Sequence, residues 1–463
     1  MKTERCDLLV VGGGPGGYTA ATRGAAKGLR VILVEKGPMG GTCLNRGCLP
    51  TKALLEDTLT VDRVRRARFL KGDLKINRER ILERKAALVA ESVAGVTQTV
   101  LDKGVTLLQG EASFAGPDRM VLERAGDEPL EIRAGHILLA TGSRPEYGSG
   151  FTIDGRRVLD TDGALALESI PRSVAVVGSG NRGVEFAAIY ANLGVRVTLI
   201  ERAKRILPRE HRWVSGRYRQ VLGLRRIQVL TQAEAVGAEH TPGGGVRLTL
   251  ESPRETPDRL EVDQVLMTGS RRPSFAGLNL EAAGLVLREG LLEHGPTLET
   301  GQKGIYVVGD AAGGPYLAHK AIAQAMAAVD GILGKEASAE DLVVPNCVYG
   351  DPEVGSVGLK DYEAKKAGHN VRLGEFYFVR NGRAGTMGKD EGLVLTVSDA
   401  DTGRVLGMHI MGPSATELIS LGVMAIRNGL TIGDLKQTVL PHMTLSEAVF
   451  EAAAATYGEA VHQ

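Results

Sequence analysis

The two cysteines at positions 43 and 48 are the residues of this chain best suited to redox chemistry. They lie in the stretch GGTCLNRGCLPTK, residues 40–52. A helical turn takes about 3.6 residues, so at a slightly distorted helix start the two sulfurs can form a disulfide or separate as thiols. Unpaired backbone N–H groups in the first turn of a helix favour a thiolate there. A structural disulfide or two buried thiols remain alternatives, and a zinc site lacks a second Cys/His pair nearby.

A glycine-rich turn and an acidic residue precede this stretch. An apolar strand is expected at residues 7–11, a helix at 17–27 and a second strand at 30–34, which Glu35 ends. The turn between the first strand and the helix holds Gly12, Gly14 and Gly17. Such glycines let the backbone approach a pyrophosphate, and the acid accepts hydrogen bonds from a ribose. The far end of this dinucleotide would extend toward the cysteines, where Lys52 supplies a positive charge for a flavin.

The same pattern occurs again 166 residues later. Gly178, Gly180 and Gly183 follow a strand at 173–177, and Glu201 ends the strand at 195–200. This repeat predicts a second dinucleotide site. Glu201 favours NAD over NADP, because a carboxylate opposed to a 2′-phosphate at 4 Å costs roughly 4 kcal/mol at a dielectric constant near 20. Arg202 and Arg205 are a counter-signal, and Glu185 in the following helix is placed to reach toward the flavin.

The composition is that of an ordinary globular protein with several domains. The chain has 463 residues, a net charge of +1 and four cysteines. This charge gives no reason to expect a nucleic acid or a membrane surface as partner, and no apolar run approaches the ~20 residues of a membrane span. The first residues run almost directly into a strand, which leaves no room for a signal peptide, so the cytoplasm is the expected location.

Two similar segments mark the exit from the first domain and the return to it. A strand at 137–140 ends in the turn TGSRP, and residues 265–273 (VLMTGSRRP) repeat this pattern. A strand at 305–308 then ends near Asp310, followed by a helix from about residue 318 to 333. The first domain is therefore expected to be discontinuous, with residues 1–145 and 271–338, and residues 146–270 form the inserted second domain. Helix is also expected at residues 71–100.

The last third of the chain changes to alternating strands with no glycine-rich phosphate loop. Residues 339–463 are expected to form an α+β domain with an apolar surface suited to dimerisation. Near its end, His442 precedes a helix start at Thr444 or Ser446, and Glu447 is placed to orient the imidazole. The fold class is α/β, with two Rossmann-like dinucleotide-binding domains and a C-terminal α+β dimerisation domain.

Four motifs give the chain a resemblance to a known family. GGTCLNRGCLPTK, GSGNRGVE, VGDAAGGPYLAHKA and PHMTLSEA occur in order along the sequence. Together they resemble the pyridine nucleotide–disulfide oxidoreductases, and the dihydrolipoamide dehydrogenase branch in particular. The resemblance implies an FAD-dependent enzyme that oxidises dihydrolipoamide and reduces NAD+ through a redox disulfide. It also implies a homodimer and a partner protein that bears lipoyl groups, from a 2-oxoacid dehydrogenase or glycine cleavage complex, and no metal.

The resemblance also assigns roles to residues. Cys43 would attack lipoamide, Cys48 would face the flavin, Lys52 would lie near the flavin and pair with Glu185, and His442 held by Glu447 would act as base on Cys43 of the other subunit. The FAD contacts would be Gly12, Gly14, Gly17, Glu35, Lys36, Gly41, Thr42, Lys52, Ala112, Thr141, Gly142, Ser143, Asp310, Leu317, Ala318 and His319. The NAD contacts would be Gly178, Gly180, Asn181, Arg182, Gly183, Glu185, Glu201, Val236 and Gly269.

Four residues, at three places in the chain, depart from the family pattern. Asn181 and Arg182 stand where bulky apolar residues are usual, Met443 stands in place of a proline, and Ser270 lengthens the second TGS turn. Two alternatives therefore stay open. One is an NAD(P)H-dependent reductase of another disulfide, and the other is a flavoprotein with an impaired nicotinamide pocket that serves as a binding subunit.

Overall fold

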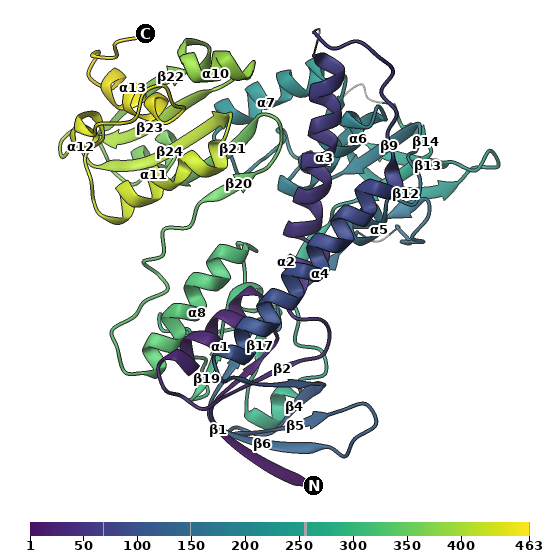
Figure 1. The fold of residues 1–463 in the computed structure, drawn as a ribbon, viewed down its shortest axis with the longest axis vertical. Coiled ribbons are helices and arrows are strands. Elements are labelled where there is room, and N and C mark those ends of the chain that lie inside the picture. The colour runs from purple at the N-terminus through teal and green to yellow at the C-terminus, as the bar shows by residue number, and fades with distance from the viewer. Residues whose placement is uncertain (68, 149, 254–256, 463) are drawn as a thin grey trace. The chain divides into compact units, whose positions relative to one another are not determined.

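The computed structural model describes residues 1–67, 69–148, 150–253 and 257–462 (Figure 1). The chain divides into two compact units, each assembled from separate stretches of sequence. The first unit contains residues 1–53, 77–147 and 269–342, and the second contains residues 54–76, 148–268 and 343–463.

The first unit is built on a mixed sheet. Its strands follow the order β3 (Thr106–Gln109), β2 (Val31–Glu35), β1 (Lys2–Val11), β6 (Leu130–Leu139), β5 (Arg119–Glu123) and β4 (Glu111–Gly116), with β19 (Ile305–Val307) also paired to β6. β1 is parallel to β2 and β6, and β19 is parallel to β6, whereas β4, β5 and β6 pair antiparallel. The short pairs β7 (Ser143–Glu146) with β16 (Ser270–Pro273), and β17 (Leu287–Arg288) with β18 (Leu291–Leu292), lie outside this sheet.

The C-terminal part of β1, residues 8–11, is buried on both faces because each face packs on a different core. Leu8 and Val10 pack with helix residues such as Ala325, whereas Leu9 and Val11 pack with Phe114 and the other core residues of β4 and β5. This two-sided burial explains the continuous apolar run of the strand.

The helices of this unit are α1 (Pro15–Ala26), α2 (Gly41–Arg46), the first residues of α3 (Cys48–Arg66), α4 (Arg78–Asp102) and α8 (Ala318–Ile332). Two 3-10 helices, η1 (Leu280–Ala283) and η2 (Gly309–Ala312), complete it.

Helix α4 begins later than its sequence pattern predicts. Helix is expected from residue 71, but α4 starts at Arg78 because Asn77 caps it. The Asn77 side chain accepts a hydrogen bond from the backbone N–H of Arg80 at 3.0 Å, which satisfies one of the open donors at the helix start.

Residues 148–268 of the second unit form a parallel sheet and an antiparallel sheet. The parallel sheet has the order β11 (Gln228–Thr231), β10 (Arg196–Glu201), β9 (Ser173–Val177), β15 (Gln264–Met267) and β8 (Val158–Leu159). The antiparallel sheet contains β12 (Glu234–His240), β13 (Val246–Glu251) and β14 (Arg259–Val262), which lie between β11 and β15 along the chain. The helices of this region are α5 (Thr161–Ala166), α6 (Asn181–Asn192) and α7 (Arg212–Leu224).

The C-terminal part of the second unit is an antiparallel sheet covered by helices. Its strands follow the order β20 (Asn346–Val348), β21 (Glu353–Gly358), β24 (Val405–Gly412), β23 (Leu393–Asp399) and β22 (Val371–Tyr377). The helical segments are α9 (Asp361–Lys366), η3 (Phe378–Arg380), α10 (Gly382–Met387), α11 (Ala415–Arg427), α12 (Ile432–Gln437) and α13 (Glu447–Ala455). α11 packs on β21 and β24, and α13 packs on β22 and β23 (Figure 1). Ile410, Ile419 and Ala452 belong to the core between them.

Across the described parts of the chain, none of the helices has the length and apolar character needed to cross a membrane.

Candidate active site

Cys43 and Cys48 lie on either side of a helix break. Cys43 is in α2, Gly47 interrupts the helical path, and Cys48 is the first residue of α3. A Cβ at Gly47 would lie 2.8 Å from the carbonyl oxygen of Thr42 and 3.4 Å from the Cα of Cys43. Only a residue without a side chain therefore lets the two helices approach closely enough to bring the cysteines together.

The side chains of Cys43 and Cys48 lie within hydrogen-bonding distance of each other. The hydrogen bond between the two thiols raises the pKa of Cys43 above its ordinary value, burial raises it further, and the positive charge of Lys52 opposes both. The position at a helix start is expected to favour a thiolate, whereas the contact with Cys48 and the loss of water favour the protonated thiol of Cys43. Cys43 therefore needs a base to become a nucleophile.

Two residues near the cysteines were missed by the sequence analysis. The side-chain amide of Asn45 donates to the carbonyl oxygens of Met39 and Gly41, each at 2.9 Å, which fixes the path of the chain into α2. Tyr18 of α1 has a raised pKa, first because of burial and then because of its proximity to Cys43 and Cys48. Asn45 lies within the motif at residues 40–52 and Tyr18 lies outside the quoted motifs, but in both cases only the fold reveals the contacts of the side chain.

The first glycine turn has the shape that a pyrophosphate requires. Gly12 has φ +105°, and a Cβ on it would lie 2.4 Å from the carbonyl oxygen of Ala140; a Cβ on Gly17 would lie 1.7 Å from the carbonyl oxygen of Gly12. Gly14 and Gly41 pass so closely that a Cβ on Gly41 would lie 2.8 Å from the Cα of Gly14. Side chains at these positions would collide with the backbone and displace the turn, whose position at the start of α1 suits a phosphate group.

Glu35 is held in place beside this turn. Its carboxylate accepts hydrogen bonds from the backbone N–H of Gly13 at 2.6 Å and of Gly37 at 2.8 Å. A carboxylate has about four acceptor positions, so capacity remains for the hydroxyl groups of a ribose. The next predicted residue, Lys36, is exposed and pairs with Glu111 at 3.5 Å, which places it beside the strand that carries Ala112.

The remaining predicted FAD residues of the first unit gather at the ends of β6 and β19. The hydroxyl of Ser143 donates to the Asp310 carboxylate, and Arg271 donates from Nε to Ser143 Oγ at 2.6 Å. The Thr141 hydroxyl is buried without a hydrogen-bond partner, as expected for a group that awaits a ligand. Gly142 has φ +71°, and Leu317, Ala318 and His319 form the N-terminal end of α8. The glycine cradle and this unpaired hydroxyl fit a bound FAD.

The second glycine turn repeats the first in detail. A Cβ on Gly183 would lie 1.8 Å from the carbonyl oxygen of Gly178, and Gly178 has φ +99°. Glu201, which is buried, accepts hydrogen bonds from the backbone N–H of Ser179 at 3.0 Å, from its hydroxyl at 2.6 Å and from the backbone N–H of Ala203 at 2.8 Å. Glu201 therefore accepts from backbone N–H groups at the two positions that correspond to those bound by Glu35, and it also accepts from the Ser179 hydroxyl. This geometry fits the adenosine half of NAD.

The other predicted NAD residues are less closely grouped. Asn181 and Arg182 are the first two residues of α6, and Gly180 is its N-cap. Val236 lies at a bulge of β12, where the pairing with β13 shifts. Gly269 lies in the first unit between β15 and β16, with φ +59°, and a Cβ there would lie 2.8 Å from the carbonyl oxygen of Glu146.

His442 and Glu447 form an ordered pair at the start of α13. The Nδ1 atom of His442 lies 2.8 Å from Oε1 of Glu447, and Oε2 of Glu447 accepts a hydrogen bond from the backbone N–H of Thr444 at 2.7 Å. This second bond, and then the pairing with His442, hold the pKa of Glu447 below its ordinary value despite some burial. The imidazole is 82% exposed, so its Nε2 side is open to another chain.

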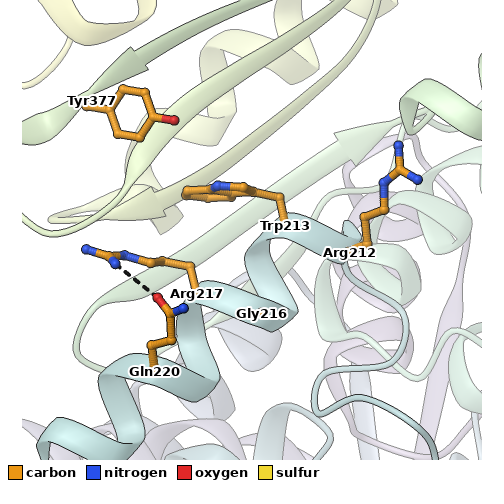
Figure 2. A pocket seen from close by; sticks show the side chains of 6 residues that line it. All are labelled: Arg212, Trp213, Gly216, Arg217, Gln220 and Tyr377. Atoms are coloured by element: carbon orange, nitrogen blue, oxygen red, sulfur yellow. Dashed lines mark hydrogen bonds between the residues drawn. The ribbon is translucent and has the colours of Figure 1, made fainter.

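A separate open pocket lies between α7 and β22. Its lining residues are Arg212, Trp213, Gly216, Arg217, Gln220 and Tyr377, and its volume is about 480 Å³. Figure 2 shows Tyr377 facing α7 and the hydrogen bond from Arg217 to Gln220, which is 3.0 Å long. None of the predicted site residues lines this pocket.

Two family descriptions match the sequence. Residues 6–325 match "pyridine nucleotide-disulphide oxidoreductase", and residues 344–453 match "pyridine nucleotide-disulphide oxidoreductase, dimerisation domain". Curated relatives include the dihydrolipoyl dehydrogenases of Thermus scotoductus, 40% identical over 100% of this chain and 99% of the relative, and of Bacillus subtilis, 36% identical over 100% of both.

Solved structures with the same fold also superpose well on this chain. LpdA from Mycobacterium tuberculosis superposes with a TM-score of 0.90 at 30% identity, and covers 97% of this chain and 99% of its own. The HOCl-induced flavoprotein disulfide reductase RclA from Escherichia coli gives a TM-score of 0.86 at 26% identity, with the same coverage. These matches confirm the predicted fold class.

Proposed function

Because the chain belongs to the pyridine nucleotide–disulphide oxidoreductase family, we propose that it oxidises dihydrolipoamide and reduces NAD+. Its cofactors are FAD and NAD. One observation carries the proposal. The same chain contains two glycine turns, each hydrogen-bonded to a glutamate side chain, and two thiols in direct contact. Similarity to dihydrolipoyl dehydrogenases over the full length supports lipoamide as the substrate.

The thiol pair carries out the exchange with the substrate. In the oxidised enzyme a thiolate of dihydrolipoamide attacks Cys43, the Cys43–Cys48 bond breaks, and Cys48 leaves as a thiolate. The second substrate sulfur then displaces Cys43, so that the substrate becomes a cyclic disulfide and the enzyme becomes a dithiol. Bound FAD supplies the two-electron carrier between this dithiol and NAD+. His442 accepts the proton released by the substrate, and Glu447 stabilises the resulting imidazolium.

The base comes from a second copy of the chain in this proposal. The match of residues 344–453 to a dimerisation domain supports a homodimer, and the exposed imidazole of His442 supports a site completed across it. A lipoyl-bearing protein of a 2-oxoacid dehydrogenase or glycine cleavage complex is the proposed partner, and the cytoplasm is the proposed location.

A steady-state assay of NAD+ reduction by dihydrolipoamide tests the function. Cys43→Ser is expected to abolish turnover while the purified protein keeps its FAD absorbance, because the thiol attacked by substrate is lost and the glycine cradle is untouched. Turnover retained in this variant would refute the thiol exchange.

A reductase of another disulfide is the second candidate, and the similarity to RclA favours it. Measurements of kcat/KM for lipoamide with NADH and for glutathione disulfide with NADPH separate the two candidates. A higher value for lipoamide with NADH favours the first, and a higher value for glutathione disulfide with NADPH favours the second. The buried Glu201 carboxylate predicts a strong preference for NADH, because it opposes a 2′-phosphate.

A further inference from the structure

Side chains on one face of α6, near its start, form hydrogen bonds with β20 and with Tyr349, the residue after β20. Nδ2 of Asn181 donates to Oδ1 of Asn346 at 2.8 Å and to the carbonyl oxygen of Cys347 at 3.0 Å. Glu185 accepts a hydrogen bond from the backbone N–H of Tyr349 at 3.1 Å. Residues 181 and 185 are four apart and therefore lie one above the other on the helix.

A hydrogen-bonded chain continues from Asn346 into the segment between β10 and α7. Nδ2 of Asn346 donates to Oε1 of Glu210, so both ends of the Asn346 amide are engaged and its orientation is fixed. Glu210 is only 1% exposed. Burial raises the pKa of Glu210, although the Ser356 hydroxyl, the Asn346 amide and the charge of Lys360 favour the ionised form.

The same segment also contacts the second glycine turn directly. The backbone N–H of Leu207 donates to the carbonyl oxygen of Ser179 at 3.0 Å, and the backbone N–H of Glu210 donates to Leu207 at 2.9 Å. The turn at residues 207–210 therefore reaches the nucleotide-binding loop in two ways, once through Ser179 and once through Asn346 and Asn181.

The start of α6 depends on outside support because its N-cap is Gly180, which has no side chain to cap the helix. The open backbone N–H groups there are the donors that meet a pyrophosphate. We propose that Asn346 and Glu210 are positioning residues for NAD, which act through Asn181 to hold the start of α6 against the nucleotide. This inference rests on the proposed function for the identity of the nucleotide. It predicts a defect in NAD+ binding with an unchanged reaction between substrate and thiol pair.

The variants Asn346→Ala, Glu210→Ala and Glu210→Gln test the proposal in the FAD-loaded dimer. The Kd for NAD+ is measured by calorimetry and its KM in the steady state, with flavin reduction by dihydrolipoamide followed in the absence of NAD+. Both alanine variants are expected to weaken NAD+ binding and raise its KM about tenfold, with kcat and flavin reduction near the wild-type values. Glu210→Gln is expected to bind NAD+ nearly as the wild type does, since its amide oxygen still accepts from Asn346.

Asn192→Ala is the matched control, because Asn192 is also buried, lies at the other end of α6 and donates to Thr58 at 3.4 Å. The control should keep the wild-type Kd. Unchanged NAD+ binding in both alanine variants, an equal loss in the control, or a glutamine variant as weak as the alanine variant each overturns the proposal. A wild-type enzyme that does not react with dihydrolipoamide refutes the proposed function instead, and the comparison of NAD+ affinities still decides this inference.

Discussion

At the scale of single residues, the imidazole of His442 depends on one carboxylate for its orientation. Glu447 accepts from Thr444 and faces Nδ1 of His442, so Nε2 is presented outward. His442→Gln is expected to lower kcat for dihydrolipoamide oxidation about 10²- to 10⁴-fold, because a thiol of the substrate must lose its proton to a base before it attacks the Cys43–Cys48 bond. Stopped-flow measurement of flavin reduction locates the defect at thiol exchange.

Glu447→Gln provides the comparison for this prediction. The amide still accepts from Thr444 but no longer stabilises a charged imidazolium, so a smaller loss with an altered pH profile is expected. A His442→Gln enzyme with normal flavin reduction would contradict the assignment of this residue as the base.

His409 is expected to affect the stability of the protein and not its catalysis, because its buried surroundings lower its pKa. The pKa of His409 is lowered to about 4, first by burial, which the hydrogen bond to the Leu359 carbonyl and the charge of Glu363 oppose and the charges of His211 and Lys360 reinforce. The unfolded chain therefore binds more protons between pH 6.5 and 4, and stability is lost as pH falls through this range. The shift corresponds to about 3 kcal/mol.

His409→Gln should remove this dependence, since glutamine does not titrate and still donates to Leu359. Urea unfolding at pH 7 and pH 4 is expected to show a stability loss about 3 kcal/mol smaller in the variant than in the wild type. Parallel losses in the two proteins would show that His409 is not the responsible group.

The residues that were predictable from the sequence are those fixed by local spacing. Glu35 and Glu201 end strands at the same distance from their glycine turns, so their positions beside those turns follow from the pattern alone. Tyr18 and Asn346 were not predictable as site residues, because the contacts of each join separate segments of the chain.

At the scale of elements, two strand–turn–helix units carry the two nucleotide sites separately. Gly17→Ala forces a Cβ to within 1.7 Å of Gly12, and Gly183→Ala forces one to within 1.8 Å of Gly178. Each change must displace one turn only. Gly17→Ala is therefore expected to lose FAD on purification, whereas Gly183→Ala is expected to retain FAD and to lose measurable NAD+ binding by calorimetry.

Gly216→Ala is a control for the second variant, because a Cβ there meets open space within a helix of the same unit. Loss of both cofactors in either glycine variant would mean that the two units do not act independently. The sequence predicted the type of these elements better than their ends, and α4 shows why: periodicity marks the body of a helix, but a cap such as Asn77 sets its start.

At the scale of the whole molecule, the proposed function requires that Cys43 of one subunit meet His442 of the other. A hybrid dimer of one Cys43→Ser subunit and one His442→Gln subunit retains one intact site if the thiol and base meet across the interface. Two affinity tags allow its isolation, and its activity is expected to be about half that of the wild type because a two-fold dimer has two equivalent sites.

A dimer of one wild-type subunit and one double-variant subunit is the reciprocal control. It should be nearly inactive, because each of its sites lacks either the thiol or the base. The opposite result, with an inactive hybrid and a half-active control, would place both residues of a site in the same subunit.

The pairing of β19 with β6 also has a consequence for how the protein is made. Ser143 and Asp310, which meet at the ends of these strands, are 167 residues apart in the sequence. During synthesis the ribosome must release the whole intervening segment before the first sheet gains its last strand. The inserted region can fold while the first sheet is still unfinished, and stable uptake of FAD has to wait until α8 emerges. A nascent chain halted before Ile305 should therefore be colourless and susceptible to proteases in its N-terminal part, even where the inserted region is already resistant.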